Sequence, residues 1–187
     1  EVASAAQLAQ QQVQQFLSRA TPEQIFEIFN GGQSAPDRQW AERLADLQKS
    51  LADGSLVVQV VAMDRASQFT AMAAFTPQGP NGQPTIFINP YWVGMFDDAD
   101  VVRILVEEMG HAIDAQLNPS ADTPGDEGEA FADRVIDGEL SLAQSAFLQT
   151  EKDDGTVTVD GVTFTFFDDG QLDALMPTDG TRIPKNS

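Results

Sequence analysis

The sequence predicts an α+β fold with N-terminal helices, a small mixed sheet, a helix pair that carries a candidate active site, and a C-terminal β-hairpin. The 187 residues suit one domain, and a hydrophobic content of 42% is enough to build a core. Helix-patterned segments come first and short β-branched segments follow. We expect a single domain over 1–187, with a helical part at 1–54, the sheet and site helices at 55–138, a helix and hairpin at 139–176, and a loose tail at 177–187.

The first third of the chain predicts three helices. Ala3 to Phe16 contains no Gly or Pro. Thr21 to Gln24 resembles an N-cap followed by Pro at the first helical position, and the helix it opens ends at Gly31-Gly32. A third helix begins after Pro36 and ends at Asp53-Gly54. Its apolar side chains recur at spacings of three and four residues: Trp40, Leu44, Leu47 and Leu51.

Short strands follow the helices. Residues 56–61 are β-branched, and 69–76 and 85–89 are also typical of strands. The segment 77–84 is rich in Gly and Pro, which predicts a connector that joins the last two strands as a hairpin.

Two further helices come next. The longest helix candidate is capped between Asp97 and Asp100, runs to Gln116, and ends at Asn118-Pro119. A polar loop then leads to a helix over 126–136. We expect the candidate site on this helix pair.

The C-terminal part predicts one helix and one hairpin. Residues 140–148 have a helical pattern. Asp160-Gly161 lies between strand-like segments at 156–159 and 162–167, which is a strong signal for a two-residue hairpin.

Composition limits the chemistry and the partners. The chain has 29 acidic and 10 basic residues, so a nucleic acid or an anionic membrane would be repelled. There is no apolar run of the roughly 20 residues that a membrane helix needs, so we expect no membrane insertion. Without cysteine, a transition metal would depend on histidine and carboxylate, and His111 is the only histidine.

A polar stripe follows one side of the longest helix. At about 100° per residue it contains Glu107, His111, Asp114 and Asn118. Such a stripe is most often a solvated helix surface. Here the only histidine lies one turn after Glu107, Ile104 interrupts the polar side, and Gly110 costs about 1 kcal/mol relative to Ala in a helix. These features favour a site and the close approach of another element at Gly110.

The segment Glu107 to His111 has the spacing of the zinc-hydrolase pattern H-E-x-x-H, with Glu in place of the first His. Carboxylate is an accepted zinc ligand, so Glu107 and His111 can hold a metal, and Glu108 is the candidate general base. A second anionic ligand weakens the metal as a Lewis acid, because it raises the pKa of bound water.

A third ligand is expected at the start of the next helix. Glu129 is slightly preferred, and Glu127 is the alternative. Acidic residues are also favoured in a first helical turn by the helix dipole, which accounts for at least one of them without a metal. Asp126 is best interpreted as the N-cap.

The residues Glu107 to Asp114 and Glu129 to Asp133 resemble the H-E-x-G-H-A-x-D and E-x-F-A-D elements of gluzincin metallopeptidases, and Thr85 to Pro90 is similar to the edge strand of that zincin fold. The resemblance implies zinc at Glu107, His111 and Glu129, with Glu108 as the base. Tyr91 follows the strand and is a candidate to stabilise an oxyanion, although a structural role is the commoner one.

A closer resemblance covers most of residues 40–165. It is carried by Leu51 to Gly54, Ile86 to Ile88, Leu105 to His111, Asp122 to Gly128 and Val159 to Gly161. These segments resemble an uncharacterised module of large secreted bacterial proteins, many of them cyanobacterial, of the hemolysin-type calcium-binding repeat class. Similar modules also contain E-E-x-G-H. The resemblance implies secretion or a cell-surface location, and it singles out Asp122 and Glu127.

Three functions follow from these observations. The leading hypothesis is a metal-dependent peptidase that acts on a peptide or protein substrate, its own parent chain included. The alternative is an inactive zincin-like module that binds a protein partner or calcium, which prefers six to eight oxygen ligands. Its candidate calcium ligands are Asp114, Asp122, Asp126, Glu127 and Glu129. A di-iron site would need a second histidine, which the sequence lacks.

Overall fold

The computed structural model describes residues 2–55, 58–62, 73–93 and 96–138, and the backbone of two strands at 154–159 and 162–167. The helices are α1 (Val2–Arg19), α2 (Pro22–Ile28), α3 (Arg38–Ala52), α4 (Pro90–Val93), α5 (Asp98–Leu117) and α6 (Glu127–Ile136), with a short 3₁₀ turn at Pro80–Gly82. The strands are β1 (Gln59–Ala62), β2 (Ala73–Thr76), β3 (Thr85–Ile88), β4 (Asp154–Val159) and β5 (Val162–Phe167). Helices and a mixed sheet are both present, so the α+β class is confirmed.

The N-terminal helices begin where their capping residues predict. At α2 the Thr21 hydroxyl accepts from the backbone N–H of Gln24, and the Gln24 side chain accepts from the backbone N–H of Thr21. At α3 the carboxylate of Asp37 accepts from the backbone N–H of Trp40 at 2.7 Å. These bonds satisfy amide groups that have no partner inside a helix, which fixes where each helix starts.

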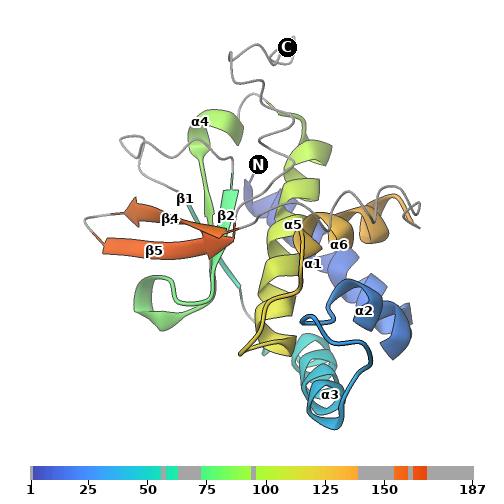
Figure 1. Ribbon diagram of the computed structural model, residues 1–187. Coiled ribbons are helices and arrows are strands. Elements are labelled where there is room, and N and C mark those ends of the chain that lie inside the picture. Colours follow the sequence, from blue (N-terminus) through green and yellow to red (C-terminus); the bar gives the residue numbers. More distant parts are fainter. Residues whose placement is uncertain are drawn as a thin grey trace.

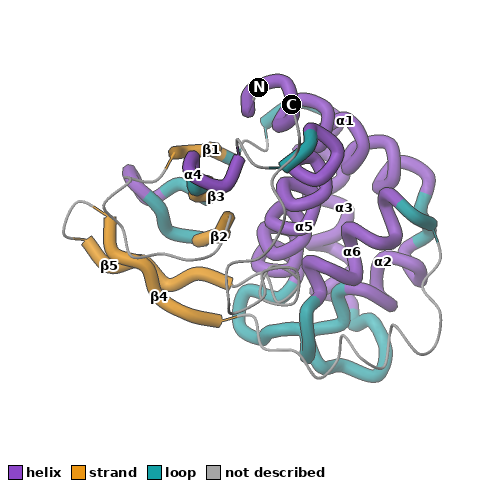
Figure 2. The backbone as a smooth tube through the Cα atoms, turned by 90° about the horizontal axis from the view of Figure 1, so that it is seen from above, coloured by secondary structure: helices purple, strands orange, loops and turns teal. Residues whose placement is uncertain are grey.

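Helix α5 lies between the sheet and helices α1, α2, α3 and α6, while α4 lies on the side of the sheet (Figures 1 and 2). It packs against α1, α3 and α6, and against strands β2 and β3. Aromatic contacts hold the helical side together: the ring of Phe131 on α6 lies 5.6 Å from Phe16 and 5.2 Å from Phe29, between centroids. Burial of such side chains contributes about 1.5–3 kcal/mol each, so α6 is firmly packed on its inner side.

The sheet has the strand order β1-β3-β2-β5-β4. Strand β3 runs parallel to β1 and antiparallel to β2, while β5 joins β2 through the single pair Phe75↔Phe167. Every residue of β2 and β3 is buried, which explains why the two strands are apolar without strict alternation. The predicted β2–β3 hairpin is confirmed.

The C-terminal hairpin is confirmed as β4 paired antiparallel with β5. Its predicted turn at Asp160-Gly161, the predicted helix at 140–148 and the predicted tail at 177–187 lie outside the described residues. No helix in the described part of the chain is long and apolar enough to cross a membrane.

The polar stripe of α5 is buried, so the interpretation as a solvated surface is wrong. From Val101 to Asp114 every residue of α5 is buried except Arg103. The apolar side of the helix meets α1, β2 and β3, and the polar side meets α6 and the loop before it. Helical periodicity identified the two sides correctly but could not show that both are covered.

Candidate functional site

The site forms where α5 and α6 come into close contact through glycine. A Cβ atom built on Gly110 would lie 2.9 Å from the Cα of Gly128, and one built on Gly128 would lie 2.9 Å from the carbonyl oxygen of Glu107. Distances this short are not seen for real Cβ atoms, so glycine at both positions allows the two backbones to touch. The predicted approach of another element at Gly110 is confirmed.

Polar side chains connect the two helices on either side of this contact. Toward the C-terminal end of α6, Arg103 forms ion pairs with Asp133 and Asp137. Toward the N-terminal end, His111 Nδ1 lies 2.8 Å from Glu127 Oε1. The chain therefore attaches α6 through His111 of the polar stripe and through Arg103, which pairs with the buried Asp133 and the exposed Asp137.

The His111–Glu127 pair is almost completely removed from water, with side-chain exposures of 0% and 1%. Burial lowers the pKa of His111, but the carboxylates of Glu127, Glu108 and Asp126 raise it by more, so the pKa lies well above its ordinary value. The raised pKa favours the protonated imidazole, whose Nδ1–H donates to Glu127. The pair lies inside a group of carboxylates.

The imidazole of His111 also depends on Gly128. A Cβ on Gly128 would lie 2.5 Å from Nε2 and 2.7 Å from Cε1 of the ring. The ring therefore lies directly against the first turn of α6, in a space that only glycine leaves open. The ring therefore contacts α6 through Gly128 as well as through Glu127.

The carboxylate of Asp114 lies one turn farther along α5. Its Oδ1 accepts from Asn118 Nδ2 at 2.7 Å and from the Thr123 hydroxyl at 2.5 Å, and its Oδ2 accepts from the Thr123 backbone N–H at 3.4 Å. Burial and the nearby charge of Glu127 raise the pKa of Asp114 to about 7, although these hydrogen bonds act to lower it. The group is thus poised between its charged and neutral forms at neutral pH.

Asp122 completes the group from the loop between the helices. The residue is exposed, but partial burial of its carboxyl group raises its pKa, and the charge of Glu127 adds to this effect. The positive charge of His111 and a hydrogen bond with Asp114 act in the opposite direction. Crowded carboxylates of this kind are stabilised by protons or by a cation.

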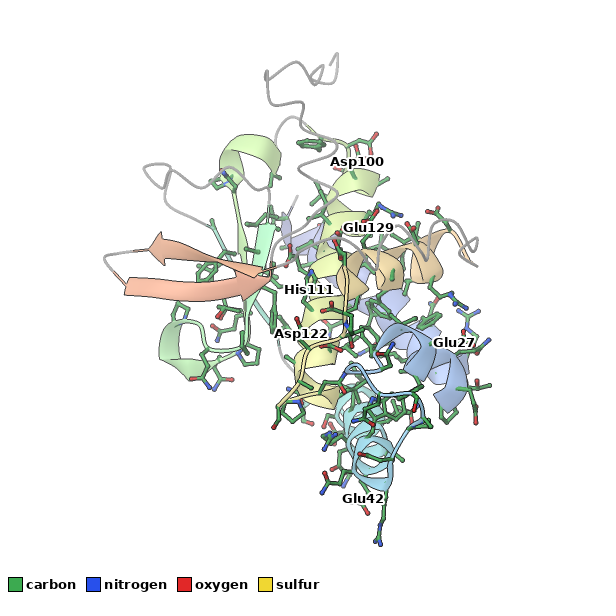
Figure 3. The ribbon with its side chains drawn as sticks, in the orientation of Figure 1. Glu27, Glu42, Asp100, His111, Asp122 and Glu129 are labelled. Carbon is green, nitrogen blue, oxygen red and sulfur yellow. The ribbon has the colours of Figure 1, made fainter. Side chains whose placement is uncertain are left out.

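Asp114, Asp122 and Glu127 can hold a metal ion. Each offers one oxygen, and these three oxygens all lie within 4.8 Å of one another. Among the described residues this is the one group of three or more His, Cys, Asp or Glu side chains with such spacing. Figure 3 shows Asp122 and His111 near the junction of α5, α6 and the loop that connects them. We call these three carboxylates the acidic triad.

The ligands predicted from the zinc-hydrolase pattern are only partly brought together. Glu107 and His111 are buried one turn apart on α5, and Glu129 is buried in the first turn of α6. These three do not form a group with the spacing found in the acidic triad within the described residues. Their role as zinc ligands stays a prediction.

Three other predicted residues have distinct positions. Glu108 is fully buried, and its charge acts on His111. Asp126 is the N-cap of α6, as predicted, because its carboxylate accepts from the backbone N–H of Glu129 at 2.7 Å. Tyr91 belongs to α4, but its side chain lies outside the described part. The roles of Glu108 as base and Tyr91 as oxyanion donor stay predictions.

Sequence reasoning missed Thr123, which gives Asp114 two of its hydrogen bonds. Its place directly after Asp122, in a loop that returns the chain to α6, is the one signal that could have drawn attention to it. Comparison of the chain with protein-family models, with curated proteins and with solved structures found no match.

Proposed function

We propose that this chain is a metal-binding domain that holds one divalent cation at the acidic triad. The supporting observation is the convergence of three carboxylate oxygens from α5, the following loop and α6 within 4.8 Å of one another. Because Asp114 and Glu127 are buried and Asp122 is exposed, the cation would enter and leave through the loop.

The ligand chemistry favours a hard cation, and calcium is the first candidate. All three ligand atoms are oxygens, and hard cations such as calcium prefer carboxylates, carbonyls and water to nitrogen or sulfur. Burial is the main cause of the raised pKa values of Asp114 and Asp122, and the charge of Glu127 is the second; a cation would offset that charge. Zinc, which the resemblance to metallopeptidases implies, is the competing candidate.

Calorimetric titration of chelator-treated protein with calcium, magnesium and zinc tests this function. Asp122→Asn is the key variant, because the residue is exposed and its replacement leaves the core intact. We expect calcium affinity to fall about tenfold or more, since one of three charged ligands is lost. Asp98→Asn, an exposed carboxylate at the far end of α5, is the matched control and keeps wild-type affinity. If no cation binds the wild type, the function is wrong.

A second candidate is a metal-dependent peptidase of zincin-like fold, at the cell surface or in the medium, as the resemblance implies. The observation in its favour is that the Glu107–His111 segment packs directly on the acidic first turn of α6, with His111 bonded to Glu127. Here Glu108 would be the base and Glu107, His111 and Glu129 the zinc ligands. Both glutamates on α5 are 0% exposed, so metal binding is the better supported function.

Cleavage of an unstructured protein by the wild type and by Glu108→Gln tests the peptidase. We expect cleavage that requires zinc and is lost in the variant, since the base in such a mechanism typically contributes about 10²–10⁴-fold. Cleavage that is equal in both proteins would show that Glu108 is not the base.

A further inference from the structure

A chain of hydrogen bonds, buried at Asn118 and part-buried at Gly31, joins the acidic triad to the turn between the N-terminal helices α2 and α3. The turn between α2 and α3, residues 29–32, is called here the α2–α3 turn. Its Gly31 backbone N–H donates to the Thr123 hydroxyl at 2.9 Å, and its Phe29 carbonyl accepts from Asn118 Nδ2 at 3.3 Å. Thr123 and Asn118 both donate hydrogen bonds to the carboxylate of Asp114. The turn is therefore one step removed from a proposed metal ligand.

The direction of these bonds shows how the turn acts on Asp114. The Thr123 hydroxyl has a single hydrogen, and its oxygen accepts from the N–H of Gly31. Its hydrogen is then directed to Asp114 Oδ1. Since Asp114, Thr123 and Asn118 are each at most 5% exposed, water cannot readily replace the bonds among these three residues.

Glycine is also needed at position 31, because a side chain there would meet Asn118. Its φ angle is +58°, and a Cβ on it would lie 2.4 Å from Oδ1 and 2.6 Å from Cγ of Asn118. A side chain at this position would displace the amide that donates to Asp114. The neighbouring Gly32 has a similar φ of +73°, but its Cβ would meet nothing closer than Pro124 at 3.9 Å.

The turn carries the connection on to α3. The indole Nε1–H of the fully buried Trp40 donates at 2.9 Å to the Phe29 carbonyl, the same oxygen that accepts from Asn118. A change in the Asn118 amide therefore alters the hydrogen bonding of Trp40. This gives the chain a built-in reporter close to the site.

We propose that the α2–α3 turn is a positioning element for the metal ligand Asp114, so that cation binding and docking of the turn are coupled. The proposal rests on the acidic triad being a metal site. Gly31, Thr123 and Asn118 hold the carboxylate in the orientation that faces Asp122 and Glu127. The N-terminal helices are then part of the binding device, although they supply no ligand.

Calcium titration of Gly31→Ala and Gly32→Ala tests the coupling. Both substitutions place a Cβ at a positive φ, so their backbone strain is matched, but only Gly31→Ala displaces Asn118. We expect Gly31→Ala to bind calcium about tenfold more weakly than Gly32→Ala, because Asp114 loses an orienting bond. Equal affinities in the two variants would overturn the coupling and leave the proposed function standing, whereas no binding by the wild type would overturn both.

Two measurements keep the test decisive where Gly31→Ala does not fold. Thr123→Val removes the hydroxyl, whereas Thr123→Ser keeps it. We expect calcium affinity to fall in the Val variant and to stay near the wild-type value in the Ser variant. In the wild type, the indole N–H resonance of Trp40, assigned with Trp92→Phe, is expected to shift as calcium is added. An unmoved resonance, or equal affinities of the Val and Ser variants, would contradict the coupling.

Discussion

The two ends of the α5–α6 interface differ in their charges: one end pairs opposite charges, and the other brings like charges together. At one end Arg103, 19% exposed, is paired with Asp133 and Asp137. At the other end the acidic triad gathers like charges, two of them buried. Opposite charges in a partly exposed position form a structural contact, whereas buried like charges are unfavourable until protons or a cation neutralise them. The first end therefore fixes the packing of the two helices, and the second is suited to binding a cation.

The largest expected loss of stability comes from removing the imidazole of His111 at the buried end of the interface. In metal-free protein His111→Ala removes the imidazole that contacts the buried carboxylate of Glu127, which costs about 3–5 kcal/mol by analogy with other buried pairs. Urea unfolding in the presence of a chelator measures the change in free energy. A loss below about 1 kcal/mol, the range of surface pairs, would remove the contrast between the two ends.

The stability of the metal-free protein is expected to depend on pH through the groups at the buried end. The pKa of Asp114 is raised to about 7, so between about pH 4 and pH 7 the folded state binds a proton that the unfolded state has released. Stability is then lost as the pH rises through this window. The raised pKa of His111 extends the loss to higher pH, since the stability it gives disappears as the imidazole loses its proton.

Thermal melts of the metal-free protein between about pH 4.5 and pH 8 measure this effect, which we expect to be on the order of 3 kcal/mol. Asp114→Asn should flatten the profile, and Asp137→Asn, at the exposed end, should leave it unchanged. A profile that rises toward pH 8 would contradict the assigned crowding of the triad.

Cation binding at the acidic triad should raise the free energy of unfolding, because it offsets the repulsion between the buried carboxylates. At a calcium concentration of about 100 times Kd, a single site adds about 2.7 kcal/mol to the free energy of unfolding. At the same calcium concentration the increase should fall to about 1.4 kcal/mol or less in Asp122→Asn, whose affinity is about tenfold or more weaker, and persist in full in Arg103→Ala, because only Asp122 belongs to the triad. Equal stabilisation of both variants would place the ion elsewhere.

The glycine contact between the two ends is expected to be less sensitive. Gly128→Ala pushes on the His111 ring and on the Glu107 carbonyl, and overpacking of this kind costs about 1–3 kcal/mol. Urea denaturation of Gly128→Ala and of the wild type measures this cost. Since Ala is a better helix former than Gly, an unchanged or higher stability of the variant would argue against a tight contact at Gly128.

A smaller effect than that of His111→Ala is expected at the end that carries Arg103. Arg103→Ala removes an ion pair with Asp137, whose side chain is 68% exposed, and one with Asp133, whose side chain is 11% exposed. The first pair contributes about 0–1 kcal/mol, and the second contributes more because the Asp133 carboxylate is nearly buried. The calcium affinity of Arg103→Ala should equal that of the wild type. Urea unfolding and calcium titration check both values, and a tenfold loss of affinity would show that the two ends are not independent.

Local signals in the sequence predicted much of the framework. Thr21, Asp97 and Asp126 cap helices as their positions indicated, because a capping bond involves residues only two or three apart. The β2–β3 and β4–β5 hairpins followed from connector composition and from Asp160-Gly161. Such contacts depend on short-range geometry that the residue types themselves determine.

The site was harder to predict because it depends on contacts between distant segments. Helical spacing placed Glu107 and His111 on one side of α5, but it could not show that the imidazole turns toward Glu127. The bond between Gly31 and Thr123 joins residues 92 positions apart, and neither residue carries a local signal for it. The packing of α6 and of the α2–α3 turn decides these contacts, and periodicity does not contain that information.

The glycine contact corresponds to a sequence pattern that can be recognised without a structure. Gly110 immediately precedes His111, and Gly128 immediately follows Glu127, so each member of the ion pair has one of the contact glycines as its neighbour. A Gly-His pair followed by a Glu-Gly pair, with the His and Glu 16 residues apart, is thus a compact signature of this junction. Chains that carry both dipeptides at that spacing are the ones expected to share it, and a bulkier residue in either glycine position predicts that it has been lost.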